Sequence, residues 1–174
     1  MSQEMKYVIF DPQVDGPCHL LSRKEAKISF DWFVSQKEVR VKMLSHELER
    51  KGFPLPDSHE ALCEVFEQVL IHEVTKAGRK LTGYIYSLCL DMGIYLGEEL
   101  IRLSPEIHWV LHTFRKTDPS YQRPVLVGFD VPNKKFDYDF DFILCAYINR
   151  LANEGDEYGL VLKMFNGAKS FLPA

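Results

Sequence analysis

The segment Gly93-Ile94-Tyr95-Leu96-Gly97-Glu98-Glu99-Leu100, with Trp109 a short distance beyond it, decides the fold that we expect. It belongs to an apolar stripe that continues at helical spacing from Ile85 to Leu103, and Pro105 ends it. Glycine inside a helix costs about 1 kcal/mol relative to alanine, so two glycines one turn apart need a reason. We expect a neighbouring backbone to approach them closely. The sequence therefore predicts that residues 81–103 form the central helix of the scaffold.

Two further helices are predicted upstream of this segment. Ser22 and Glu25 form a capping box at the start of a long helix, which Gly52 ends. The next helix starts near Asp57, where Asp57 and Glu60 have the spacing of a second box. We therefore expect three helices in the first part of the chain.

The remaining segments have the patterns of strands or short elements. Tyr7-Val8-Ile9-Phe10 is a β-type run, so residues 1–21 are expected to form an edge strand or an extended N-terminal arm. Alternating residues over 107–114 and 125–131 predict a β-hairpin with a long loop.

Residues after the hairpin are predicted to return to helix. Aromatic and aspartate residues alternate over 136–142, but apolar spacing favours a helix over 139–153. Residues 160–165 fit either a last strand or a short helix. The predicted fold is α+β, with three N-terminal helices packed on a small antiparallel sheet and a further C-terminal helix.

The composition is that of a folded protein with a sizeable core, because 46% of the 174 residues are hydrophobic and 13% are aromatic. We expect a single domain over residues 1–174. The net charge of −4 disfavours nucleic acid as a partner. Because we find no long apolar run, no targeting signal and no CxxC pair among the four cysteines, we expect a cytoplasmic protein with free thiols and no membrane partner.

Four polar residues in and after the central helix are candidates for a pocket: Asp91, Glu98, His108 and His112. Histidine and carboxylate groups can form an acid–base pair or hold a metal. The spacing argues against a metal, because His108 and His112 would lie about 13 Å apart along a strand. Asp91, Glu98 and Arg102 share a helix face, which we interpret as solvated and as holding a Glu98–Arg102 pair. We expect no metal, no cofactor and no catalytic residue.

An acidic segment follows the second predicted strand. Its candidate partner-binding residues are Asp130, Asp137, Tyr138, Asp139 and Asp141. Stabilisation of a helix start explains most of these carboxylates. The same residues, with Asp156 and Glu157 further on, are also the candidate for an acidic surface that binds a basic protein.

Residues 80–131 resemble small bacterial domains of unknown function in which helices precede a strand that carries a tryptophan. The resemblance rests on Gly93-x-x-x-Gly97-Glu98, on the aliphatic Leu100 and on Trp109. Several families of this appearance are immunity proteins encoded beside polymorphic toxins. The resemblance implies no catalytic residues.

Two hypotheses about function follow. The first is a non-enzymatic cytosolic protein that binds another protein, in the form of an immunity protein that neutralises a basic toxin domain through its acidic surface. The alternative is a small hydrolase or ligand-binding domain that uses the histidine and carboxylate pocket. A concave pocket with converging carboxylates and histidines would favour the alternative. A homodimer is a third hypothesis.

Overall fold

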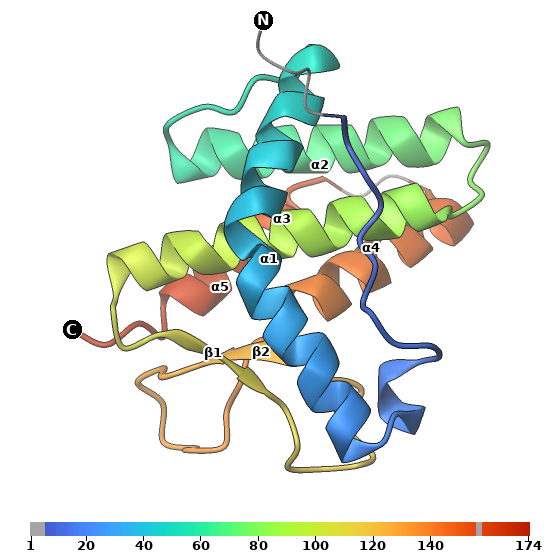
Figure 1. The fold of residues 1–174 in the computed structure, drawn as a ribbon. Helices are drawn as coiled ribbons and strands as arrows, with labels where there is room; N and C mark the ends of the chain where they lie inside the picture. Colours follow the sequence, from blue (N-terminus) through green and yellow to red (C-terminus); the bar gives the residue numbers. More distant parts are fainter. Residues whose placement is uncertain (1–5, 156–157) are drawn as a thin grey trace, which may run out of the picture.

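The computed structural model describes residues 6–155 and 158–174, and in it helices both precede and follow a small sheet (Figure 1). The elements are α1 (Arg23–Arg50), α2 (His59–Lys76), α3 (Gly83–Leu103), β1 (His108–Leu111), β2 (Pro124–Val127), α4 (Phe140–Glu154) and α5 (Leu160–Lys169). A short 3-10 helix at Cys18–Leu20 precedes α1. The α+β class is confirmed, but two helices follow the sheet where we expected one.

Helix α3 is the centre of the fold, as predicted. It packs against α1, α2 and α4, and α1 crosses it steeply (Figure 1). The fully buried side chains of Leu88, Met92, Leu96 and Leu100 form its core stripe. Helical spacing brings these residues to one face, and burying each stabilises the fold by roughly 1.5–3 kcal/mol.

The helix starts follow from the capping residues. Ser22 Oγ accepts a hydrogen bond from the Glu25 backbone N–H and the Glu25 carboxylate accepts one from the Ser22 N–H, which confirms the capping box of α1. At α2 the prediction is one residue off. Ser58, and not Asp57, is the N-cap, and its hydroxyl accepts from the Ala61 N–H at 3.2 Å. Both residue types cap helices well, so composition could not choose between them.

The two strands form the predicted antiparallel hairpin, but each is only four residues long. His108 pairs with Val127, and Leu111 pairs with Pro124. On the side of β2 that does not face β1, Leu126 exchanges two backbone hydrogen bonds with Tyr138. The later part of the acidic segment is therefore held against the sheet.

The acidic segment ends in a helix start, as expected. Asp139 is the N-cap of α4, and its side chain accepts from the Phe142 N–H at 2.8 Å. Residues 160–165, which fitted strand or helix, lie in α5. Glu67 of α2 holds the start of α5, because its carboxylate accepts from the backbone N–H groups of Gly159 and Leu160 at 2.7 and 3.0 Å. Asp156 and Glu157 lie outside the described residues.

Residues 7–10 form an extended arm that crosses α3 beside α1, and they belong to no sheet (Figure 1). Of the two structures expected for this segment, the arm is the one observed. None of the helices in the described parts of the chain combines the length and apolar character needed to cross a bilayer.

Candidate functional site

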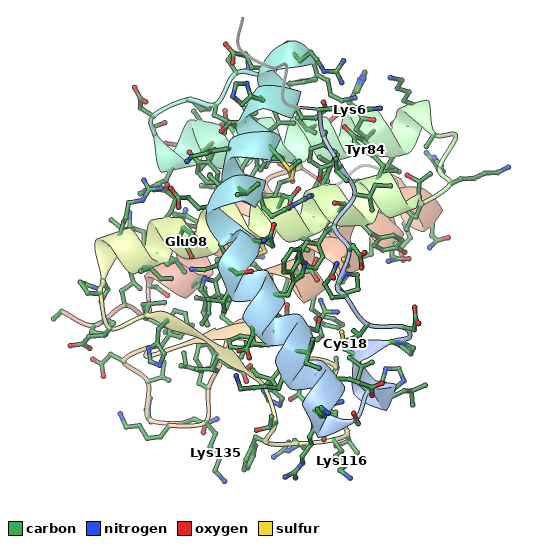
Figure 2. The ribbon with its side chains drawn as sticks, viewed as in Figure 1. Lys6, Cys18, Tyr84, Glu98, Lys116 and Lys135 are labelled. Atoms are coloured by element: carbon green, nitrogen blue, oxygen red, sulfur yellow. The ribbon has the colours of Figure 1, made fainter. Side chains whose placement is uncertain are left out.

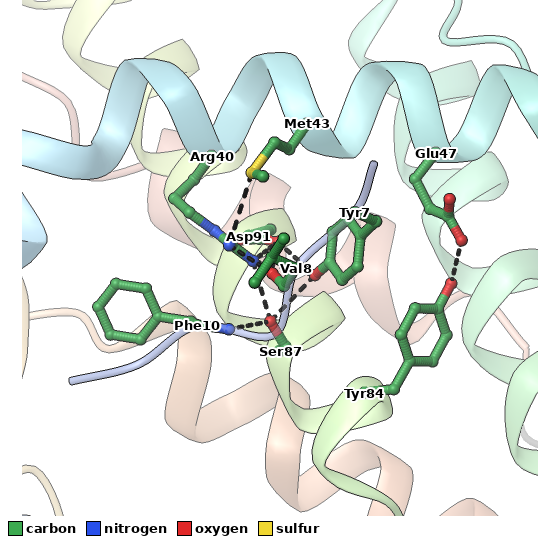
Figure 3. Close-up of polar contacts among 9 residues, drawn as sticks. All are labelled: Tyr7, Val8, Phe10, Arg40, Met43, Glu47, Tyr84, Ser87 and Asp91. Carbon is green, nitrogen blue, oxygen red and sulfur yellow. Dashed lines mark hydrogen bonds and ion pairs between the residues drawn. The ribbon is translucent and has the colours of Figure 1, made fainter. Parts of the chain in front are cut away.

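Asp91 is buried and ion-paired, which corrects the expectation of a solvated face. Its side chain has no exposed area, and Arg40 Nε and Nη2 of α1 donate to its two oxygens at 2.8 and 2.7 Å (Figure 3). The hydroxyl of Tyr7 donates to the same carboxylate. A two-point guanidinium–carboxylate contact is one of the stronger polar interactions in proteins. Asp91 therefore connects α3 to α1 and is not available to solvent.

The same cluster fixes the N-terminal arm. Arg40 Nη1 donates to the Val8 carbonyl at 2.6 Å, and the Phe10 N–H donates to Ser87 Oγ at 2.9 Å (Figure 3). Burial and the neighbouring Asp91 carboxylate raise the pKa of the Tyr7 hydroxyl well above its ordinary value, so it stays a donor. These contacts assign the Arg40–Asp91 pair to joining the arm, α1 and α3.

Glu98 does not pair with Arg102, contrary to our prediction. It accepts from Lys37 Nζ at 2.6 Å and from Trp109 Nε1 at 2.8 Å. Arg102 instead pairs with Glu99 at 2.6 Å. Asp91 and Glu98 do share a face of α3, but that face packs against α1. Lys37 and Arg40 of α1 therefore pair with the two carboxylates, and the exposed Arg102 does not.

Gly93 and Gly97 of α3 allow close packing, although only Gly93 packs against backbone. A Cβ atom on Gly93 would lie 3.1 Å from the backbone nitrogen of Asp141 at the start of α4, which confirms the expected close approach. A Cβ atom on Gly97 would lie 2.2 Å from Cζ2 of Trp109. At Gly97 the approaching group is thus an aromatic side chain.

The structure does not bring Asp91, Glu98, His108 and His112 into one pocket. His112 is buried and its Nδ1 hydrogen-bonds to Asp137, while the exposed His108 contacts the backbone oxygen of Glu106 through Nδ1 at 2.8 Å. Nε2 of His112 is buried without a hydrogen-bond partner among the described residues. Because each of the four candidates has different partners, the proposed acid–base arrangement is not assembled.

The acidic segment is largely neutralised within the protein. Arg123 donates to Asp139 at 2.8 Å and to Asp141 at 2.5 Å, and Asp137 pairs with His112. Burial raises the pKa of Asp141, an effect that Arg123 opposes. The candidate partner-binding carboxylates of Asp137, Asp139 and Asp141 therefore already have partners within the protein.

The other two candidates of this segment differ in exposure. The Tyr138 hydroxyl donates to the Met164 carbonyl at 2.8 Å, and its ring is partly buried. Asp130 alone of the five candidates is exposed. A continuous acidic surface is thus not formed by these residues.

The four cysteines have free thiols, as expected. Burial raises the pKa of Cys63 to about 12, and it also raises the pKa values of Cys18 and Cys89. A thiol with a raised pKa is a poor nucleophile near neutral pH. These three side chains are therefore not activated for covalent catalysis.

A basic and aromatic surface lies at the end of the hairpin, where the sequence had pointed to no site. We call it the hairpin-end surface, and it consists of Phe114, Arg115, Lys116, Lys134 and Lys135. Phe114 is 55% exposed, and Lys135 Nζ lies 3.9 Å from the centre of its ring. Figure 2 shows Lys116 and Lys135 projecting from the same end of the molecule.

The cations of this surface have no acidic partners within the described parts of the chain. Arg115 Cζ lies 5.9 Å from the centre of the same ring, and none of the four cations makes an ion pair with a described carboxylate. Their two loops are far apart in sequence, so no local motif predicts that they meet. The only sequence signal is that each of two polar loops has two adjacent cations next to an aromatic residue.

Comparisons with known proteins identified no relative. No family model matches the chain, and neither a curated protein nor a solved structure matches it significantly. The interpretation of its function therefore rests on its own residues.

Proposed function

We propose that this protein acts by binding another protein, and that the hairpin-end surface is its contact region. The observation that carries the proposal is the exposed ring of Phe114, which has Arg115 and Lys135 on it and Lys116 and Lys134 next to these two cations in the sequence. None of the four cations forms an ion pair with a described carboxylate. Elsewhere Lys37, Arg40 and Arg123 are each satisfied by a carboxylate.

The chemistry of this surface fits an acidic partner. Exposed cations attract a complementary surface and speed its association, and an aromatic ring supplies apolar area that is rigid and easily desolvated. Aromatic residues and arginine are enriched in protein interfaces. We infer that the contacting part of the partner has carboxylates around an apolar group that can pack on Phe114.

A role as an immunity protein is the more specific form of this proposal. It rests on the resemblance over residues 80–131 and places the partner in a neighbouring gene. The acidic contact surface that we expected has less support, because Asp137, Asp139 and Asp141 already have internal partners. We therefore propose that the partner contributes an acidic patch, and not the basic surface that we expected of a toxin domain.

The alternative of a small hydrolase has less support. It needs Asp91, Glu98, His108 and His112 around one cavity, and these residues contact different parts of the protein. A general acid and base must both reach the reacting atoms.

The proposal can be tested by co-expressing the chain with the products of its neighbouring genes and measuring the affinity of any complex by calorimetry. Lys134→Glu with Lys135→Glu should weaken binding at least tenfold. The matched control is Lys76→Glu with Lys80→Glu, which reverses two exposed charges at the far end of α2 and should leave affinity unchanged. Equal effects of the two double variants would overturn the proposed surface.

A further probe separates protein binding from binding of polyanions in general. A mixed-sequence single-stranded oligonucleotide should not compete with the partner at physiological salt, because one exposed ring and four cations are a small footprint for nucleic acid. Competition by the oligonucleotide at stoichiometric concentration would contradict a protein-specific function.

A further inference from the structure

A second feature is a groove of about 240 Å³ between α4 and α5. Its floor is formed by the buried side chains of Leu144, Val161 and Met164. Arg150 and Lys163 also line it, one from each helix, and none of the acidic side chains among the described residues does. An apolar floor beside the positive charge of Lys163 is the chemistry that recognises an amphipathic anion.

The walls of the groove are held by the rest of the fold. Tyr138 fixes one side, because its hydroxyl donates to the Met164 carbonyl while its backbone pairs with Leu126 of β2. At the start of α5, the Glu67 carboxylate binds the Gly159 and Leu160 N–H groups. A ligand would therefore enter a preformed site, which reduces the ordering cost of binding.

We propose that this groove binds a small monocarboxylate with an apolar tail, whose carboxylate meets Lys163 at the edge and whose tail covers the floor. Lys163 is exposed and forms no ion pair with a described carboxylate, so its charge is available. At roughly 30 Å³ per water-sized group, the volume suits a ligand of about eight to ten non-hydrogen atoms. A ligand of this size binds with a Kd on the order of millimolar or tighter.

Octanoate is the probe for this proposal, followed by amide chemical shifts of the intact protein during titration. We expect saturable shifts confined to the facing sides of α4 and α5. Octanol has the same tail without the charge and should bind at least fivefold more weakly, and octylammonium should bind more weakly still. Equal binding of octanoate and octanol would overturn the proposal, because the groove would then be apolar without recognising an anion.

Two variants locate the binding. Lys163→Glu should lower octanoate affinity at least fivefold, whereas Lys169→Glu makes the same charge change on α5 outside the groove and should leave it unchanged. Ile143→Trp should fill the groove and abolish the shifts, with its folding checked by circular dichroism. Loss of affinity in both lysine variants, or self-association of the chain through this groove in light scattering, would contradict a carboxylate site. None of these results depends on the hairpin-end surface.

Discussion

The indole ring of Trp109 lies against the bare backbone of Gly97, so that a Cβ atom there would be only 2.2 Å from Cζ2. The ring also donates from Nε1 to Glu98 and meets Phe33 edge-on with ring centres 5.2 Å apart. One glycine thus lets the first strand dock on the central helix. This contact explains why a residue that weakens a helix is present in the middle of one.

Gly97→Ala should destabilise the protein by roughly 1–3 kcal/mol, because the new methyl group forces Trp109 to move. The matched control is Gly167→Ala in α5, where the nearest atom to a new Cβ is the Tyr138 hydroxyl at 3.9 Å. That variant should be neutral or more stable by up to about 1 kcal/mol. Guanidinium denaturation measures both, and stabilisation by Gly97→Ala would refute the packing argument.

Breaking the Arg40–Asp91 pair should be costly in a non-additive way. Arg40→Met leaves a buried carboxylate without its cation and should cost about 3–5 kcal/mol. The double variant Arg40→Met with Asp91→Leu removes both charges and should cost much less than the sum of the single changes. A double-mutant cycle by chemical denaturation measures the coupling, and simple additivity would show that the pair does not act as a unit.

The stability of the protein should fall in alkaline solution partly because of Tyr7. Burial and Asp91 raise its pKa in the folded state, so the unfolded chain loses this proton first as pH rises above about 10. Above that pH, Tyr7 lowers the free energy of unfolding by up to about 1.4 kcal/mol per pH unit. Tyr7→Phe should flatten the profile of unfolding free energy between roughly pH 10 and 12. Parallel profiles for the two proteins would contradict this assignment.

Glu67 should control the order of α5. Replacing it with alanine leaves the Gly159 and Leu160 N–H groups without their carboxylate and should cost roughly 1–2 kcal/mol. Hydrogen exchange should accelerate in the first turn of α5 and change little in α1. Uniform acceleration across the protein would mean that Glu67 supports the whole core and not this helix start.

Local signals predicted much of the fold because their causes are local. The Ser22 and Glu25 capping box, the period of α3 and the alternation of the hairpin each depend on residues within a few positions of one another. The short segment at 160–165 was ambiguous, since its helix is completed by Glu67 from a distant part of the chain.

Long-range pairing could not be predicted in the same way. Glu98 has a correctly spaced partner in Arg102 but bonds to Lys37, which is brought near by the crossing of α1 over α3. His112 meets Asp137 only because the acidic segment returns along the sheet. The same return brings Lys135 over Phe114, so the hairpin-end surface had no signature in either loop alone.

Site-specific photocross-linking tests the proposed function most directly. Benzoylphenylalanine in place of Phe114 should cross-link one protein encoded beside this chain, and Lys134→Glu with Lys135→Glu should abolish the product. The control is the same group at Tyr158, which is 72% exposed and directly precedes Gly159, the residue whose N–H donates to Glu67 of α2. Position 158 should give no such product. Equal cross-linking from both positions, insensitivity to the charge reversal, or no cross-linked partner at all would contradict protein binding through the hairpin-end surface.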